Sequence, residues 1–216
     1  MSNYKKLLIV IFTLAPMFSS SANAEQNIVT FGFTGSVLYS DSSLNAPIDS
    51  LVSGSFSYDL NAPLTTFFSS PPSTYSYYYY TAPEALKVNF SGHSITSDLL
   101  TYTLFDNFGG NVEDQFILDS GAVKLDGVDS GGFSLALSSS YGIENTNALT
   151  SSQPPQTLDL SLFNVMPYNG GSFIVNNAYK LQFSILSITP VPEPESYALL
   201  LAGLGMIGLM VRLKKC

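Results

Sequence analysis

The chain has 216 residues, about the length of one domain, of which 45% are hydrophobic and only 11% charged. Few charged residues combined with 13% aromatic residues argue against a disordered chain. The net charge of −8 argues against a nucleic-acid-binding protein, because such a protein needs a basic surface. We therefore expect a folded domain without a nucleic-acid partner.

The first 24 residues have the pattern of a signal peptide. The segment 5–18 begins with two lysines and continues as an apolar run, and Ala22 and Ala24 then form a small-residue cleavage site. The apolar run is shorter than the ~20 residues that a membrane-spanning helix needs. We predict cleavage after Ala24, so that residues 25–190 form an exported domain.

This predicted domain is acidic and poor in catalytic residue types. Its 3 basic residues stand against 14 acidic ones, which gives a net charge of −11. The only cysteine is Cys216 and the only histidine is His93, so the domain can hold neither a disulfide nor a multi-histidine zinc site. No Gly-x-Ser-x-Gly motif accompanies His93. We expect a solvent-exposed histidine in a turn.

Alternation of apolar and polar residues predicts β-strands throughout the domain. The clearest segments are 29–39, 52–58, 86–90, 100–104, 133–137, 158–162 and 179–185. Residues that favour turns gather at 41–47, 106–111, 129–132 and 169–171. Seven to nine short antiparallel strands predict an all-β fold, a β-sandwich or jelly roll, with a closed barrel as the alternative.

A tyrosine-rich segment at 69–80 has two interpretations. Its tyrosines are Tyr75, Tyr77, Tyr78, Tyr79 and Tyr80. If exposed, they could stack on sugar rings and bind carbohydrate. In the other interpretation, which we favour because the strand 86–90 follows, the segment enters a strand whose alternate tyrosines pack in the core.

Acidic residues concentrate in a glycine-rich stretch and comprise Asp106, Glu113, Asp114, Asp119, Asp126 and Asp129. Neither the EF-hand spacing nor the glycine-rich nonapeptide repeat of calcium sites is present. We therefore expect a solvated acidic face. A glycosidase would need two carboxylates flanking a cleft, and no pair is singled out. We assign no catalytic, cofactor-binding or metal-binding residue.

The segment 189–216 consists of three physically distinct parts. Prolines at 190, 192 and 194 keep the backbone extended. The uncharged run 197–211 favours a helix, and with the next two residues it predicts a short membrane span over 197–213. Arg212, Lys214 and Lys215 follow as a basic end that we expect to stop translocation and to stay in the cytoplasm.

This tail resembles the PEP-CTERM sorting signal of exported Gram-negative proteins. The matching parts are the apolar, glycine-containing run 199–211, the basic end, and the motif Val191, Pro192, Glu193 and Pro194. The resemblance implies processing by an exosortase, a membrane cysteine transpeptidase, in bacteria that make exopolysaccharide and biofilm. One arginine and two lysines in place of an arginine run, and the terminal Cys216, depart from the pattern.

The domain also resembles an all-β type carried on such tails, in the segments 33–37, 52–59 and 80–92, a match that implies no activity. Together these observations predict a signal peptide at 1–24, a domain at 25–190 and a sorting signal at 191–216. We expect a non-enzymatic envelope or matrix protein, first anchored in the inner membrane facing the periplasm and then moved to the cell surface or beyond. The alternatives are a carbohydrate-binding module and a secreted hydrolase that uses a carboxylate pair.

Overall fold

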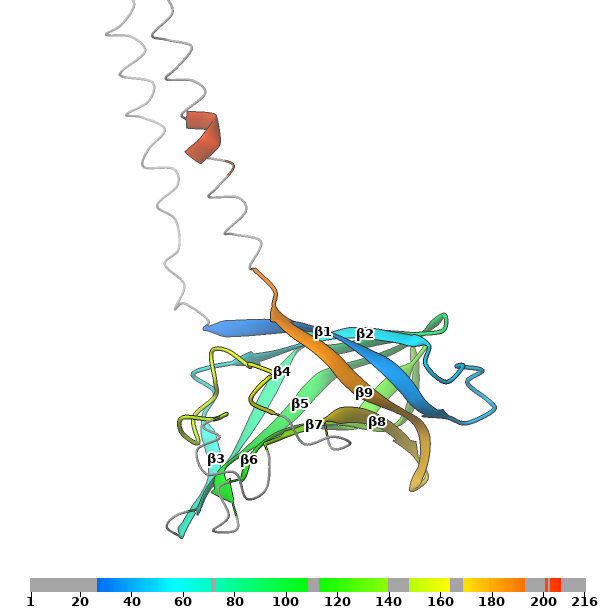
Figure 1. Ribbon diagram of the computed structural model, residues 1–216. Coiled ribbons are helices and arrows are strands. Elements are labelled where there is room, and N and C mark those ends of the chain that lie inside the picture. Colours follow the sequence, from blue (N-terminus) through cyan, green and yellow to red (C-terminus); the bar gives the residue numbers. More distant parts are fainter. Residues whose placement is uncertain are drawn as a thin grey trace, which may run out of the picture.

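The computed structural model describes residues 27–70, 73–108, 113–139, 148–163, 169–192, 201 and 203–206. Up to residue 192 these residues form antiparallel strands and their connections, which Figure 1 shows. The strands are β1 (Ile28–Ser40), β2 (Leu51–Asp59), β3 (Leu64–Ser70), β4 (Ser73–Phe90), β5 (His93–Phe108), β6 (Glu113–Leu125), β7 (Val128–Ser138), β8 (Gly170–Val175) and β9 (Ala178–Pro190). The prediction of an all-β fold is confirmed.

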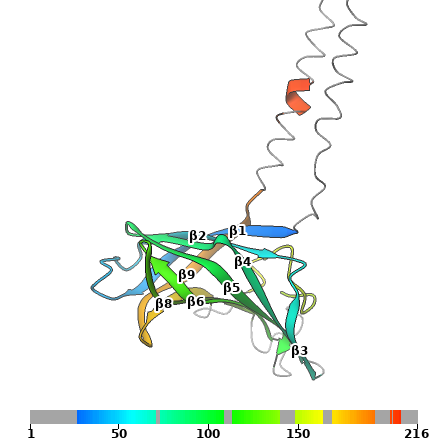
Figure 2. The ribbon, with the colours of Figure 1, turned by 180° about the vertical axis from the view of Figure 1, so that it is seen from behind.

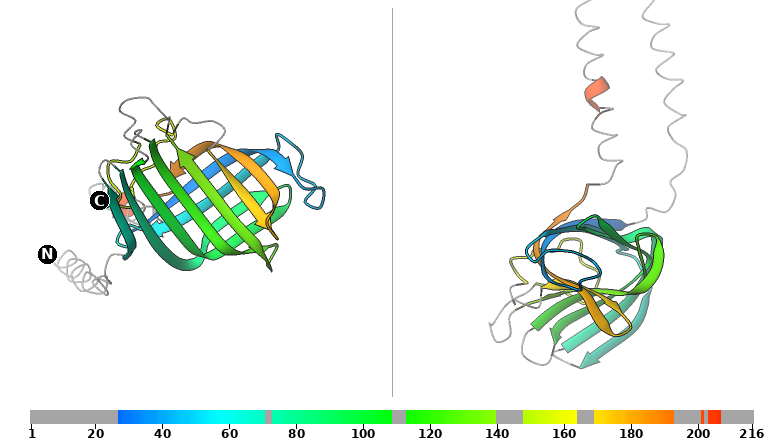
Figure 3. Two further views of the ribbon diagram at one scale, coloured as in Figure 1. Left: turned by 90° about the horizontal axis from the view of Figure 1, so that it is seen from below. Right: turned by 90° about the vertical axis from the view of Figure 1, so that its right-hand side faces the viewer.

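Eight of these strands close into a barrel. The order of hydrogen-bonded neighbours is β2-β1-β9-β8-β7-β6-β5-β4, and β2 also pairs with β4. The ring is therefore complete, as the end-on view in Figure 3 shows. The predicted β-sandwich or jelly roll is wrong, and the alternative of a closed barrel is right. An alternating pattern shows only that one face of each strand is buried. In a sandwich a second sheet covers that face, whereas here the sheet curves around and covers its own inner face.

β3 lies outside this ring and follows β2 along the same edge of β4. β4 pairs with β3 through its first residues, 73–78, and with β2 through its last residues, 86–90. β1 pairs with β2, from Ile28 opposite Asp59 to Ser36 opposite Leu51. Within the described part of the chain, β3 is paired with β4 alone.

Inward-facing aromatic side chains fill the barrel. Phe31, Phe56 and Tyr58 are fully buried, and the rings of Phe31 and Phe56 stack with centroids 5.5 Å apart. The ring of Tyr102, which is also fully buried, lies 5.0 Å from that of Tyr58. Since the interior of an eight-stranded barrel is just wide enough for side chains, the barrel encloses a packed core.

Two glycines make room for large rings in this core. A Cβ atom at Gly54 would overlap the ring of Phe33, and one at Gly171 would overlap the ring of Phe183. These two rings stack nearly in parallel, with centroids 5.9 Å apart and an interplanar angle of 3°. Small residues opposite large ones thus let the aromatic layers interdigitate.

Two-residue turns connect the strands at one end of the barrel, which we call the hairpin end. The turns are Ser91–Gly92, Asp126–Gly127 and Asn176–Asn177, and all of these residues have positive φ. Positive φ at both central positions is the requirement of a type I′ turn, which suits the twist of a hairpin.

The turn predicted at 129–132 is wrong because these residues belong to β7. Gly131 lies at a register shift between β6 and β7 and has a φ of 79°. Its backbone also approaches the carbonyl of Ile174 so closely that a Cβ would overlap it. Gly131 therefore allows a bulge within the strand, a feature that in the sequence is indistinguishable from a turn.

The loop between β1 and β2, residues 41–50, folds over the hairpin end. Leu44 and Ala46 are buried there, and Lys180 Nζ lies 3.0 Å from the Oδ2 of Asp41. Residues 42–44 form a turn, as predicted for 41–47. Of the turn predicted at 106–111, residues 106–108 belong to β5 and residues 109–111 lie outside the described part of the chain. Of the turn predicted at 169–171, residues 170 and 171 belong to β8.

The segment 148–163 covers the opposite end, which we call the tail end because β1 begins and β9 ends there (Figures 1 and 2). The Tyr58 hydroxyl donates a hydrogen bond of 2.7 Å to the carbonyl of Pro155. The Tyr78 hydroxyl donates one of 3.0 Å to the carbonyl of Ser152. The core tyrosines thus hold the covering segment on the barrel.

The strand predicted at 158–162 is wrong, because this part of the covering segment forms a turn. The Asp159 carboxylate accepts a hydrogen bond of 2.9 Å from the Ser161 N–H. Leu158 is buried, whereas Leu162 is 39% exposed. The segment therefore forms a turn stabilised by the aspartate side chain, because in the described structure it has no neighbouring strand with which its alternating residues could pair.

We predict that stability falls steeply at alkaline pH and that Tyr58 carries part of this fall. Burial raises the pKa of Tyr58 and of Tyr102 far above the ordinary value of 10.0. Above pH 10 the unfolded chain loses these protons while the folded barrel retains them, so unfolding becomes more favourable as pH rises. Tyr58→Phe should reduce the pH slope of the unfolding free energy by about 1.4 kcal/mol per pH unit.

Urea denaturation at several pH values from 9 upward measures this slope. Tyr39→Phe is the matched control, because it removes the hydroxyl of a tyrosine that is 44% exposed on the barrel surface. An unchanged slope in Tyr58→Phe would contradict the prediction, whatever the absolute stability of the variant.

Candidate functional site

The barrel holds the beginning of the C-terminal motif. β9 ends at Pro190, and the N–H of Val191 then donates a hydrogen bond of 2.8 Å to the carbonyl of Thr30 in β1. Val191 is 44% exposed, and Pro192, the next residue, is also exposed. The backbone of the chain is therefore bound to the barrel wall as far as Val191.

Most other residues predicted to act in export and sorting lie outside the described part of the chain. They are Ala22, Ala24, Glu193, Pro194, Arg212, Lys214 and Lys215. Of the predicted span 197–213, the structure describes residues 201 and 203–206, and these are helical. No helix in the described ranges combines the length and the apolar character needed to cross a membrane.

The tyrosine-rich segment is a strand whose side chains alternate between the two faces of the sheet, as the favoured interpretation predicted. Tyr78 is 5% exposed and stacks on Tyr102 with ring centroids 5.0 Å apart. Tyr80, two residues further, is partly buried against the core. Tyr75, Tyr77 and Tyr79 occupy the alternate positions and face outward. The predicted glycan-contacting residues are thus divided between the core and the surface.

His93 connects two hairpins. Its Nδ1 lies 2.7 Å from the Oδ2 of Asp126, whose Oδ1 accepts a hydrogen bond of 2.8 Å from the Ser94 N–H. These contacts hold the pKa of the Asp126 carboxyl below its usual range, with the His93 hydrogen bond as the largest cause. His93 was expected to be exposed in a turn. Instead, it directly follows the turn at 91–92, its side chain is half-buried, and it is bound to Asp126.

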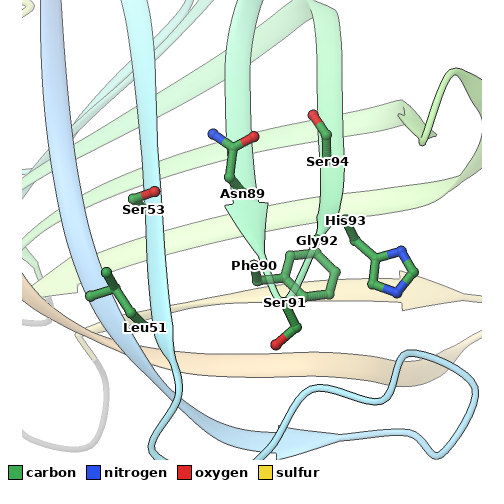
Figure 4. A pocket seen from close by; sticks show the side chains of 8 residues that line it. All are labelled: Leu51, Ser53, Asn89, Phe90, Ser91, Gly92, His93 and Ser94. Atoms are coloured by element: carbon green, nitrogen blue, oxygen red, sulfur yellow. The ribbon is translucent and has the colours of Figure 1, made fainter.

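A shallow hollow of about 350 Å³ lies beside this pair at the hairpin end. Figure 4 shows its lining, which comes from β2, from the ends of β4 and β5 and from the turn between them: Leu51, Ser53, Asn89, Phe90, Ser91, Gly92, His93 and Ser94. A catalytic triad would need a serine hydroxyl bonded to the other ring nitrogen of His93. Among the described residues, no serine side chain bonds to that ring, and the pair acts as a clamp between the β4–β5 and β6–β7 turns.

The acidic stretch is not a uniform solvated face as predicted. Asp114 is only 1% exposed, and its Oδ2 accepts a hydrogen bond of 2.9 Å from the Leu149 N–H. Burial is the largest cause that raises the pKa of Asp119, and it likewise raises the pKa of Asp106. Asp129 is exposed, as expected. Within the described ranges, no group of three or more acidic, histidine or cysteine side chains lies close enough together to hold a metal ion.

Sequence inspection missed the role of Asp114, although a signal was present. Asp114 shares its strand parity with Phe116 and Leu118, which are fully buried. A strand predicted at 113–125 would therefore have placed this carboxylate inside the barrel. There it anchors the segment 148–163 at the tail end.

Comparison with known proteins bears on the tail alone. Residues 190–215 match the family model of the PEP-CTERM protein-sorting motif. No curated protein and no solved structure matches the chain.

We predict that Asp114→Ala lowers the free energy of unfolding by about 1–3 kcal/mol, the usual cost of leaving a buried donor without its hydrogen-bond partner. The Leu149 N–H would lose its partner, and the covering segment would detach first. Chemical denaturation measures the loss, and limited proteolysis within 148–163 reports the detachment. Asp129→Ala on the surface is the control and should change stability by no more than about 0.5 kcal/mol. Equal effects of the two substitutions would exclude an anchoring role for Asp114.

Proposed function

We propose that this protein, which carries a PEP-CTERM sorting motif, is an exported, non-enzymatic protein of the cell envelope or extracellular matrix. The motif at 190–215 is the observation that carries the proposal, because it marks a protein sorted by an exosortase. In this proposal the signal peptide is removed after Ala24, and the tail holds the precursor in the inner membrane with the barrel on the periplasmic side. Processing then sends the barrel to the cell surface or the exopolysaccharide matrix.

The relation between the barrel and the tail supports this order of events. The strand pairing of the barrel ends at Pro190, the first residue of the matched segment, and the described core residues all lie upstream of it. Among the described residues, those beyond Val191 belong neither to a strand nor to the core, so cutting the chain there leaves the described barrel whole. A domain that is complete without its tail suits a cargo that is anchored first and released later.

The structural use of polar groups supports a non-enzymatic role. His93 and Asp126 clamp two turns together, and Asp114 anchors the covering segment. The interior of the barrel holds stacked aromatic rings where a ligand-binding barrel would hold its ligand. Each of these groups has a task in the architecture that accounts for it without a catalytic role.

We predict that the C-terminus of the processed protein lies at Val191 or later. An enzyme that grips an extended peptide needs free backbone, whereas the Val191 N–H is bonded to Thr30. Intact mass spectrometry of the protein from cells that contain the sorting enzyme identifies the terminal residue. A product that ends before Val191 would mean that the end of β9 detaches during processing, contrary to this prediction.

We predict opposite failures for two changes in the tail. Glu193→Ala should leave an anchored, uncut precursor, because the enzyme loses its recognition motif. The triple change Arg212→Ser, Lys214→Ser and Lys215→Ser should let the chain pass through the membrane unprocessed, because the positive charges no longer stop translocation.

Cell fractionation followed by intact mass spectrometry distinguishes these two outcomes. Glu84→Ala and Lys124→Ser, both on the surface of the barrel, are the matched controls and should mature normally. Normal maturation of both tail variants would disprove sorting through this tail.

A further inference from the structure

The outward side of β4 carries a row of aromatic rings that the proposed sorting function does not use. Tyr75, Tyr77 and Tyr79 follow one another at every second position, so their side chains stand on one face about 6.6 Å apart. The residues opposite them in β5 are Phe105, Thr103 and Thr101, respectively. We call these six residues the tyrosine face.

The rings of the tyrosine face support one another. Tyr77 and Tyr79 meet edge to face, with centroids 5.1 Å apart and an interplanar angle of 87°. Tyr75 lies against Phe105 with ring centroids 5.2 Å apart. Tyr79 is 46% exposed, and its hydrogen bond with Tyr77 is the largest cause that raises its pKa. The face therefore presents rings that are fixed in place and partly open to solvent.

The chemistry of the face combines rings and hydroxyl groups without charge. Its residues are tyrosine, threonine and phenylalanine, and β3, which borders it beyond β4, has the uncharged sequence LTTFFSS. The acidic residue Asp119, in β6, lies opposite Thr101, and it is the nearest charged residue paired with the face. Among the described residues, none of the strand partners of the tyrosine face is basic, so no positive charge there would attract an anion.

We propose that the tyrosine face binds a neutral polysaccharide. The apolar faces of sugar rings pack against tyrosine rings, while the tyrosine hydroxyls exchange hydrogen bonds with the sugar hydroxyls. Electrostatics disfavours an anionic chain, because a domain with 14 acidic and 3 basic residues between positions 25 and 190 repels an anionic polymer. Their alternation with the inward-facing residues of β4 places these tyrosines on the convex side of the barrel.

This inference does not depend on the sorting function. Binding is a property of the barrel surface and can be measured with purified protein, whereas sorting is measured by the mass of the product in cells. Failure of one proposal therefore leaves the other standing.

Affinity electrophoresis of the full-length protein in detergent, through gels that contain dextran, xyloglucan or soluble β-1,3-glucan, tests the proposal. We expect at least one of these neutral polymers to retard the wild-type protein, and alginate, an anionic polymer, to have no such effect. The double variant Tyr77→Ala and Tyr79→Ala should bind about tenfold more weakly or not at all, which corresponds to a loss of about 1.4 kcal/mol or more.

Two matched variants separate ring stacking from general effects. Tyr39→Ala with Tyr179→Ala removes two other exposed tyrosines, which are 44% and 52% exposed, and should bind like the wild type. Tyr77→Phe with Tyr79→Phe keeps the rings and should retain most of the binding. Circular dichroism and thermal unfolding show whether each variant is folded.

Several results would overturn the proposal. These are wild-type protein that no neutral polymer retards, a Tyr77→Ala and Tyr79→Ala variant that binds unchanged, a phenylalanine variant that binds as weakly as the alanine variant, or binding to alginate alone. Sedimentation analysis tests whether a second copy of the chain occupies the face. If the wild type dimerises and the alanine variant does not, the tyrosine face joins two copies of the chain instead of binding polysaccharide.

Discussion

The pairing of β2 with β1 along one edge and with β4 along the other is the constraint on which the architecture depends. It turns a curved sheet into a ring and brings Phe31 and Phe56, on neighbouring strands, into the same core as Phe116 from across the barrel. Because the ring uses only the end of β4 for this closure, the beginning of β4 pairs with β3 outside it. One strand therefore contributes both to the closed core and to an outer face with its own row of rings.

Closure also determines how the tail is attached. β9 lies between β1 and β8: its pairing with β8 ends at Ser184, whereas its pairing with β1 continues to Pro190, where the sorting motif begins. The bonds to β1 continue through Pro190 and the N–H of Val191. A pull on the tail is consequently borne by the ladder between β1 and β9, and the extended prolines follow directly where this ladder ends. A rigid barrel is thus joined to a segment whose extended backbone can be bound by a processing enzyme.

Polar groups that suggest chemistry in the sequence serve the ends of the barrel. At the hairpin end, Asp126 accepts bonds from His93 and from the Ser94 N–H and thereby couples two turns that are distant in sequence. At the tail end, Asp114 and the hydroxyl groups of Tyr58 and Tyr78 bind the backbone of residues 148–163. Open ends are where a barrel would admit water to its core, and these contacts keep the covering segments in place.

The sequence by itself determined the all-β class, the inward parity of strands such as β1 and β2, and the sorting tail, because alternation and an ordered motif are local properties of the chain. It also indicated that alternate tyrosines of β4 enter the core. Only the tertiary structure decided between sandwich and barrel, since the same alternation buries one face in either architecture. Tertiary contacts likewise decided that residues 158–162 form a covering turn, that Gly131 serves a bulge, and that His93 and Asp114 bind distant partners. The bulge and the contacts of His93 and Asp114 depend on segments far apart in sequence, which no local pattern specifies. The turn at 158–162 is held by a local aspartate hydrogen bond, but the described part of the chain gives this segment no neighbouring strand to pair with.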